Sequence, residues 1–166
     1  MLFLNRIREK NKDLLKKENL LFLTLSIMIF FIDRITKLKI LTNFSDETFF
    51  INDYLNIDLI WNIGIGFGFL STDSFLIYSL VSILIGLIIL FLIYAMATSQ
   101  KVDKFIYSII IGGALGNFYD RLTFKAVPDF IDLHYNNFHW FTFNVADIFI
   151  TFGIIIFVIR SFFVKS

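Results

Sequence analysis

A run of 24 residues without a charged side chain, 74–97, most constrains what this chain can fold into. As a helix it would be about 36 Å long, at ~1.5 Å per residue, which exceeds the ~30 Å hydrocarbon core of a bilayer. The composition agrees, because 57% of the 166 residues are hydrophobic, more than is usual in a soluble domain. The sequence therefore predicts an integral-membrane protein.

Further apolar segments predict a mainly α-helical membrane protein with four transmembrane helices. The predicted spans are 20–41, 73–97, 103–122 and 141–163. The first span is the weakest, because its apolar run, 20–32, covers only 13 residues before Asp33. It can cross a bilayer only if Asp33, Arg34 or Lys37 lies near its outer end. The whole chain, 1–166, is expected to form a single membrane domain.

The distribution of positive charge predicts the orientation of these spans. Residues 1–19 carry six Lys or Arg against three acids, and further Lys and Arg lie in the loop 98–104 and near the C-terminal end. Such residues are enriched in cytoplasmic loops, so both termini are expected in the cytoplasm. The basic N-terminal segment would suit an anionic cytoplasmic leaflet. The connections 42–72 and 123–140 would then lie outside.

The two outer connections have different predicted structures. Residues 55–59 alternate apolar and polar side chains, so a small antiparallel β-sheet is predicted between the first two spans. Residues 123–140 are rich in aromatic side chains, which favours a segment at the membrane interface between the third and fourth spans. Pro128 is the only proline and directly precedes Asp129. This arrangement predicts a loop or the start of a strand at Asp129.

Polar side chains inside the apolar segments form helix-phased sets. Charged groups in a bilayer are costly, so each set is a candidate for function. Three predicted helices carry such a face near their outer ends, and we expect these faces to converge on one pocket. The sets are Asp33 and Lys37 on the first helix, Asn117, Asp120 and Arg121 on the third, and Asn144 and Asp147 on the fourth. They serve either as polar contacts between helices or as contacts to a substrate.

Asp129 and Asp147 have no opposite charge within helical reach in the sequence. Two carboxylates in a partly desolvated site can share one proton, because like charges a few Å apart cannot both ionise cheaply. The ionised member can take a proton from water while the protonated member polarises a carbonyl, which is acid–base catalysis on an amide. Asp132, which lies between them in the sequence, is interpreted as solvated surface.

The sequence offers few ligands for a metal ion. It has no cysteine, and its two histidines, His134 and His139, are five residues apart without an HExxH pattern. We interpret them as a poor metal pair, and we expect no metal or cofactor.

Five sequence blocks resemble those of the lipoprotein signal peptidase (signal peptidase II) family. They are "DRITK" (33–37), "NIGIGF" (62–67), "GGALGNFYDR" (112–121), "VPDF" (127–130) and "FNVAD" (143–147). The blocks occur in the order that the family has. Gly66 departs from the pattern, because the family usually has alanine there, and glycine loosens the backbone.

The resemblance implies a four-helix aspartyl protease of the bacterial inner membrane. It would remove the signal peptide of a prolipoprotein before a cysteine that already carries diacylglycerol, without a metal or cofactor, and globomycin would block it. Asp129 and Asp147 match the catalytic pair. The matched supporting residues are Asp33, Lys37, Asn62, Gly64, Asn117, Asp120, Arg121 and Asn144. The expected partners are the diacylglyceryl-modified prolipoprotein and membrane lipids, not nucleic acid, and we expect a monomer.

Other functions remain alternatives at this point. A proton-coupled small membrane transporter also uses acids on inward helix faces, although the inverted repeats common in transporters are not evident. A presenilin-like protease would also use two aspartates, but its G-x-G-D signature is missing. A non-catalytic scaffold would leave the match of both Asp129 and Asp147 to the family blocks unexplained.

Overall fold

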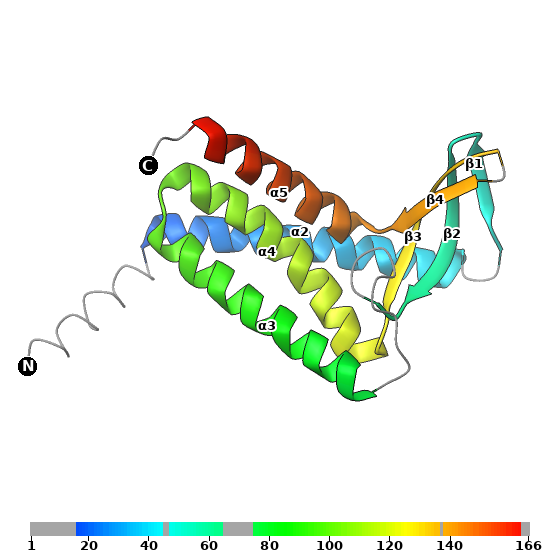
Figure 1. Cartoon of the computed structure of the whole chain (residues 1–166), viewed down its shortest axis with the longest axis horizontal. Helices are drawn as coiled ribbons and strands as arrows, with labels where there is room; N and C mark the ends of the chain where they lie inside the picture. The colour runs from blue at the N-terminus through cyan, green and yellow to red at the C-terminus, as the bar shows by residue number, and fades with distance from the viewer. Residues whose placement is uncertain (1–15, 45–46, 65–74, 137, 164–166) are drawn as a thin grey trace, which may run out of the picture.

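The computed structural model describes residues 16–44, 47–64, 75–136 and 138–163. In these residues, long helices form a bundle with an antiparallel sheet at one end (Figure 1). The helices are α2 (Lys17–Asn43), α3 (Phe75–Thr98), α4 (Lys101–Phe124) and α5 (Val145–Phe163). The strands are β1 (Phe49–Asn52), β2 (Leu55–Asn62), β3 (Val127–Tyr135) and β4 (Phe138–Phe143).

Helix α4 is the central element of the bundle and packs against α2, α3 and α5. Helices α2 and α4 run toward the sheet, whereas α3 and α5 run away from it (Figure 1). The start of α2 and the end of α5 therefore lie at the end of the bundle opposite the sheet. This alternation brings the C-terminal ends of α2 and α4 and the start of α5 to the end of the bundle that carries the sheet (Figure 1).

Among the described residues, three helices are long and apolar enough to cross a membrane. They cover Lys17–Asn43, Leu76–Thr98 and Val145–Phe163. Helix α4 does not meet this criterion, and its buried side chains include Lys104, Asp120 and Arg121. The prediction of a mainly helical membrane protein is confirmed, whereas a fourth span formed by α4 stays a prediction.

Glycines allow α4 to approach its neighbours closely. A Cβ added to Gly112 would lie 2.7 Å from the Cβ of Ile29 on α2, and one added to Gly113 would lie 2.5 Å from the carbonyl oxygen of Ala146 on α5. One added to Gly116 would meet the carboxylate of Asp33. Gly112 and Gly116, four residues apart, therefore form a surface of small residues against which α2 packs.

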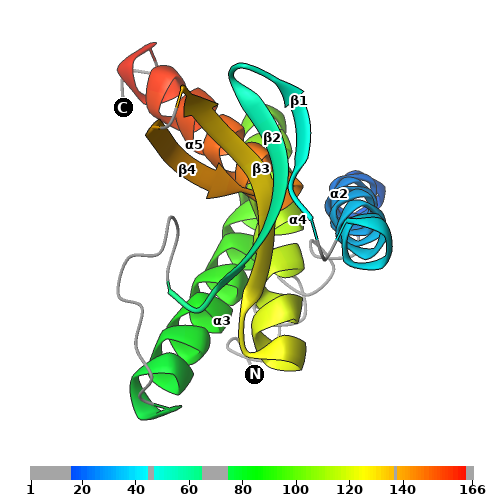
Figure 2. The ribbon, with the colours of Figure 1, turned by 90° about the vertical axis from the view of Figure 1, so that its right-hand side faces the viewer.

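The sheet has the order β1-β2-β3-β4, and all neighbouring strands are antiparallel. It crosses the end of the helix bundle (Figure 2). The outer connection between α2 and α3 thus supplies β1 and β2, as predicted. The segment 123–140 contains the end of α4, β3 and the start of β4, and its place at the membrane interface stays a prediction. Residues 141–143, predicted to begin the last span, also belong to β4.

Two register shifts decide which side chains share a face of the sheet. Between β2 and β3, Ile57 pairs with Ile131 but Ile60 pairs with Asp129, so β2 carries one extra residue. Since successive strand residues point to opposite faces, this bulge turns Asn62 onto the face of Asp129. Asn56, which lies before the bulge, pairs with Asp132 and shares the other face.

The second shift lies between β3 and β4. Leu133 pairs with Phe141, but His134 pairs with His139, so the extra residue is on β4. This bulge turns His139 onto the face that carries His134 and Asp132. Asp129 and Asp132 therefore lie on opposite faces of β3, because they are three residues apart.

Gly116→Ala should destabilise the protein by about 1–3 kcal/mol, because its methyl group would displace the Asp33 carboxylate in a closely packed contact. Gly86→Ala on α3 is the matched control, since its Cβ would meet only the edge of the Phe118 ring, at 3.2 Å. Thermal unfolding in detergent micelles should show a lower midpoint for Gly116→Ala than for Gly86→Ala. Equal midpoints would contradict the close approach of α2 and α4 at Gly116.

Candidate active site

A buried lysine joins α2 and α4 below the sheet. The Nζ atom of Lys37 lies 2.8 Å from Oδ2 of Asp33, 2.7 Å from Oδ2 of Asp120 and 2.8 Å from Oδ1 of Asn117. Lys37, Asp33 and Asp120 are all 0% exposed. The ammonium group donates three hydrogen bonds, which is all that it can donate. In this network, two carboxylate oxygens and one amide oxygen accept all three hydrogen bonds of the buried ammonium group.

Arg34 supplies the second positive charge of the network. Its guanidinium pairs with Oδ1 of Asp120 and lies 4.8 Å from the centre of the Tyr119 ring. The sequence grouped Asp120 with Arg121, but Asp120 pairs with Arg34 and Lys37 of α2 instead. Sequence spacing could not show this, because the partners lie more than 80 residues apart in the chain.

The network also fixes the start of α5. Oδ1 of Asp33 accepts a hydrogen bond of 3.0 Å from the backbone N–H of Ala146. The first N–H groups of a helix have no partner within the helix, so a carboxylate here satisfies one of them and suits the helix dipole. Asp33 thus connects Lys37 with the helix that carries Asp147.

Asn117 relays the network to Asp147. Its Oδ1 accepts from Lys37, and its Nδ2 donates to Oδ1 of Asp147 at 2.7 Å. Because Lys37 can only donate, the orientation of the Asn117 amide is fixed. Its NH₂ group must then face the carboxylate of Asp147.

Asn144 directly precedes α5 and contacts both candidate carboxylates. Its Oδ1 accepts from the backbone N–H of Asp147 at 3.1 Å, and Oδ2 of Asp147 accepts from the backbone N–H of Asn144 at 3.1 Å. This reciprocal pair is a capping box. The Nδ2 of Asn144 donates to Oδ1 of Asp129 at 2.5 Å. The Asn144 side chain therefore holds the start of α5 and the start of β3 together.

Asp129 is held from β2 as well. Nδ2 of Asn62 donates to Oδ2 of Asp129 at 2.8 Å, while Oδ1 of Asn62 accepts from the backbone N–H of Gly64 at 2.9 Å. The bulge in β2 makes this contact possible, since it places Asn62 and Asp129 on one face. Asp129 is the third residue of β3 and is 3% exposed.

Arg121 joins α4 to the segment that follows β2. Its Nη2 donates to the carbonyl oxygen of Gly64 at 2.9 Å, and its Nη1 donates to that of Asn117 at 3.2 Å. The Nε atom is buried and has no hydrogen-bond partner among the described residues. Arg121 therefore keeps one donor directed at a buried region beside the candidate carboxylates. Gly66 lies outside the described residues.

Asp129 and Asp147 line a single cavity of about 320 Å³. Asn62, Asn117 and Arg121 contribute the other polar side chains of its wall. Its remaining wall is mostly apolar and is formed by Ile85, Ala114, Val127, Ile150, Thr151 and Ile154. The structure thus brings the two carboxylates to one partly apolar space, whereas Asp33, Lys37 and Asp120 of the predicted polar faces do not line it.

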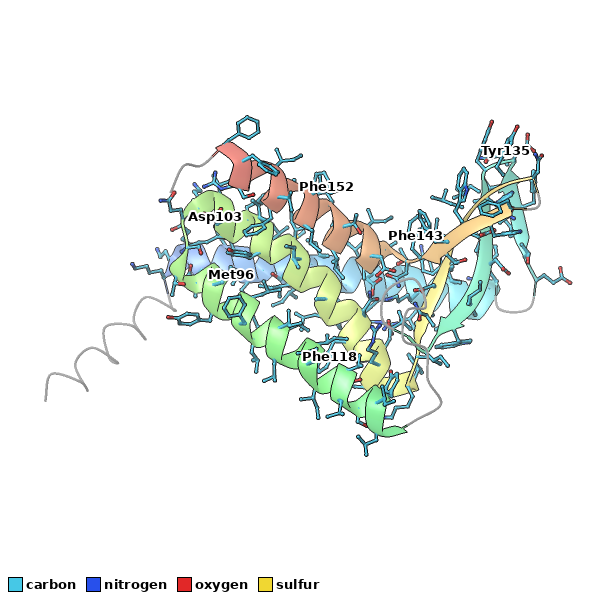
Figure 3. The ribbon with its side chains drawn as sticks, viewed as in Figure 1. Met96, Asp103, Phe118, Tyr135, Phe143 and Phe152 are labelled. Atoms are coloured by element: carbon cyan, nitrogen blue, oxygen red, sulfur yellow. The ribbon has the colours of Figure 1, made fainter. Side chains whose placement is uncertain are left out.

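An apolar cavity of about 360 Å³ lies beside the first. The two share Asp147 and Thr151 on α5. Its other lining residues are Phe141, Phe143, Ile148, Phe152 and Ile155. Two of its lining residues, Phe143 at the end of β4 and Phe152 farther along α5, are labelled in Figure 3. An apolar tail bound here would lie next to one of the two carboxylates.

The surroundings of Asp129 change the pKa of its carboxyl group. Burial and, second to it, the nearby charge of Asp147 together raise the pKa of its carboxyl to about 6, against the lowering effect of the hydrogen bonds from Asn62 and Asn144. Both causes favour the protonated form. The geometry therefore lets the pair hold one proton at a pH at which an exposed aspartate would be ionised.

The burial of Asp132 contradicts the interpretation of this residue as solvated surface. It is 1% exposed, and its Oδ2 lies 2.8 Å from Nδ1 of His139. The prediction was wrong because it treated residues 123–140 as an exposed segment, whereas β3 has a neighbouring strand on each side. Asp132 lies on the opposite face of β3 from Asp129 and does not line the cavity that Asp129 and Asp147 share.

Comparison with known proteins agrees with the sequence blocks. The family model described as signal peptidase (SPase) II matches residues 25–163, which contain all the predicted site residues. The chain belongs to the signal peptidase II family. Membership makes it a membrane protease of this family.

Curated relatives and a solved structure are similar over most of the chain. The lipoprotein signal peptidase of Pelagibacter ubique (strain HTCC1062) is 47% identical over 147 residues, covering 87% of this chain and 89% of the relative. That of Francisella tularensis subsp. mediasiatica (strain FSC147) is 35% identical over 157 residues, covering 92% and 98%. A solved structure described as a bacterial membrane enzyme has a TM-score of 0.71 at 28% identity, covering 85% and 87%.

Lys37→Met should destabilise the protein by about 3–5 kcal/mol, because it leaves the buried carboxylate of Asp33 without its cation. Lys39→Met, an exposed position on the same helix, is the matched control and should have little effect. Thermal unfolding in detergent micelles measures both. A Lys37→Met variant as stable as Lys39→Met would refute the role of this network in holding the helices together.

Asp129→Asn should change how stability depends on pH. Folding raises the pKa of Asp129 from 3.8 to about 6, so the protonated carboxyl of Asp129 favours the folded protein. This stabilisation is full below the ordinary pKa of aspartate and is lost as pH rises through about 6. Asparagine does not titrate, so the melting temperature of Asp129→Asn relative to wild type should rise from about pH 4 to about pH 7 and then level off. A constant difference would contradict the raised pKa.

Asp147→Asn provides the electrostatic control for the same measurement. This substitution removes the charge of Asp147, which is the second cause of the raised pKa of Asp129, and leaves the burial of Asp129 unchanged. In this background, the pH range over which Asp129 affects stability should therefore move to lower pH. An unchanged range would show that the two carboxylates do not interact.

Proposed function

We propose that this protein is an aspartic endopeptidase that removes the signal peptide from diacylglyceryl-modified prolipoproteins. It cleaves before the lipid-bearing cysteine by means of water activated between Asp129 and Asp147. The observation that carries this proposal is that two carboxylates from separate elements, β3 and α5, line one cavity and are both bonded to Asn144. The lipoprotein signal peptidases of P. ubique and F. tularensis support the choice of substrate.

Hydrolysis by this pair requires one shared proton. The ionised carboxylate accepts a proton from water, and the resulting hydroxide bonds to the scissile carbonyl carbon, while the protonated carboxyl donates its proton to the carbonyl oxygen. When the C–N bond breaks, the proton taken from water passes to the departing amine. The proton on the former carbonyl oxygen returns to the carboxylate that donated it, so the C=O bond re-forms and the pair again holds one proton. The raised pKa of Asp129 suits it to be the member that holds the shared proton.

The surrounding amides keep the carboxylates apart and oriented. Each carboxylate accepts two N–H bonds: Asp129 from Asn62 and Asn144, and Asp147 from Asn117 and the backbone of Asn144. Preorganised donors of this kind cost no rearrangement during the reaction. Arg121, which lines the same cavity, can hold a backbone carbonyl of the bound peptide.

The neighbouring apolar cavity suits the lipid part of the substrate. Its lining of phenylalanine and isoleucine side chains shares Asp147 with the polar cavity. An acyl chain in this cavity would bring the lipid-bearing cysteine, and thus the bond before it, close to the carboxylates. The apolar exposed surface of α5 would let that chain enter from the bilayer.

We further propose that α4 is the fourth transmembrane span. Its charged residues near the sheet, Asp120 and Arg121, are bonded within the protein, and at the other end Lys104 donates to Asn19 of α2 at 2.5 Å. Intramembrane charges face the bundle interior in this way. The sheet then lies outside the bacterial inner membrane, both termini lie in the cytoplasm, and the enzyme acts as a monomer.

A cleavage assay tests the proposal directly. The purified full-length protein in detergent micelles is incubated with a diacylglyceryl-modified prolipoprotein, and the product is identified by mass spectrometry. Cleavage should occur before the lipid-bearing cysteine and should be blocked by globomycin. Asp129→Asn and Asp147→Asn should each lower the rate by about 10²- to 10⁴-fold, as expected for loss of an acid–base group.

Asp53→Asn is the control variant, because Asp53 is exposed in the turn between β1 and β2. It should retain the wild-type rate. Full activity in both dyad variants would overturn the proposed mechanism. A wild-type protein that cleaves nothing but moves protons across liposome membranes would favour the transporter alternative.

A further inference from the structure

A second polar cluster lies on the face of the sheet opposite the candidate active site. It consists of Asp132 and His134 of β3 and His139 of β4, with Asn56 of β2 beside them. One ligand atom from each of Asp132, His134 and His139 lies within 4.8 Å of the others. No step of the proposed hydrolysis uses these residues.

Several buried polar atoms of this cluster have no hydrogen-bond partner among the described residues. Nδ1 of His139 lies 2.8 Å from Oδ2 of Asp132, which is a normal hydrogen bond. Oδ1 of Asp132 and Nδ1 of His134 are buried and have no hydrogen-bond partner among the described residues, and the same holds for Oδ1 of Asn56. Burying polar atoms without partners is costly, so the cluster needs a further partner.

The spacing of the donor atoms fits a metal ion. Tetrahedral coordination at ~2.0–2.1 Å places two ligand atoms roughly 3.3 Å apart. In the cluster, Oδ2 of Asp132 lies 3.5 Å from Nδ1 of His134 and 2.8 Å from Nδ1 of His139. The two imidazole rings are stacked, with centroids 5.4 Å apart, so both nitrogens face the same carboxylate. Only small side-chain shifts would close the three donors around an ion.

The fold creates this juxtaposition through the bulge in β4. Without the extra residue, His139 would lie on the face opposite His134, because strand side chains alternate. His139 is also the exposed member, with 57% of its side chain accessible. It leaves a path from solvent to Asp132 and His134, which are both buried.

We propose that Asp132, His134 and His139 bind a divalent transition-metal ion of the zinc type. Two imidazole nitrogens and one carboxylate oxygen are a common zinc donor set, and they leave a fourth position open for water or for Oδ1 of Asn56. Magnesium and calcium prefer oxygen ligands and do not suit this set. The site ties β3 to β4, and it is independent of the proposed peptidase function.

Zinc titration of the purified, tag-free full-length protein in detergent micelles tests this site. The protein is stripped with EDTA, and ZnCl₂ is then added in competition with a chromophoric chelator. The wild type should bind one Zn²⁺ per chain. His139→Gln and Asp132→Asn should each weaken binding at least about tenfold, since even the loss of a supporting residue around a metal site costs 10- to 100-fold.

Two further measurements separate this site from the candidate active site. Asp129→Asn should bind Zn²⁺ as tightly as wild type, because Asp129 lies on the other face of β3. Co²⁺ added to wild type should give visible absorption bands of a tetrahedral ion, and these should be absent in His139→Gln. Since His139 is exposed, its variant should elute like wild type in size-exclusion chromatography.

Absence of zinc binding by wild type would overturn the proposal and would mean that water fills the cluster. Wild-type affinity in both His139→Gln and Asp132→Asn would overturn it too, as would loss of binding in Asp129→Asn alone. The peptidase assay and the zinc titration can fail separately, because they depend on different residues.

Discussion

The ammonium group of Lys37 is the interaction on which the rest of the site depends. It lies inside an apolar bundle, and its three protons go to Asp33, Asp120 and Asn117. Through Asp33 it holds the first turn of α5, and through Asn117 it orients Asp147. A buried charge is tolerated only when it is fully paired, so this one requirement fixes three helices relative to one another.

The sheet imposes a second constraint, because the bulges in β2 and β4 assign polar side chains to opposite faces. The bulge in β2 joins Asn62 to Asp129, and the bulge in β4 joins His139 to Asp132. Two acids three residues apart in β3 thereby enter different environments. Asp129 shares a cavity with Asp147, whereas Asp132 lies beside the imidazole rings of His134 and His139.

Asn144 links the two halves of the molecule. Its backbone and side chain cap α5 in a reciprocal contact with Asp147, and its free amide N–H reaches Asp129 in the sheet. A helix start is a precise place for a carboxylate, since the capping bonds fix its position. Helix packing and sheet pairing therefore meet at a single asparagine.

The sequence by itself determined the membrane class, the apolar segments and the candidate carboxylates, because hydropathy and residue type act locally. It also determined the family, through five blocks in order. It misplaced Asp132, did not reveal that Asp120 pairs with Arg34 and Lys37, and did not reveal that His134 and His139 face one carboxylate, since these contacts depend on strand register and helix packing. Only the tertiary structure decided these contacts, because a single bulge turns a side chain to the opposite face and chain spacing does not record it.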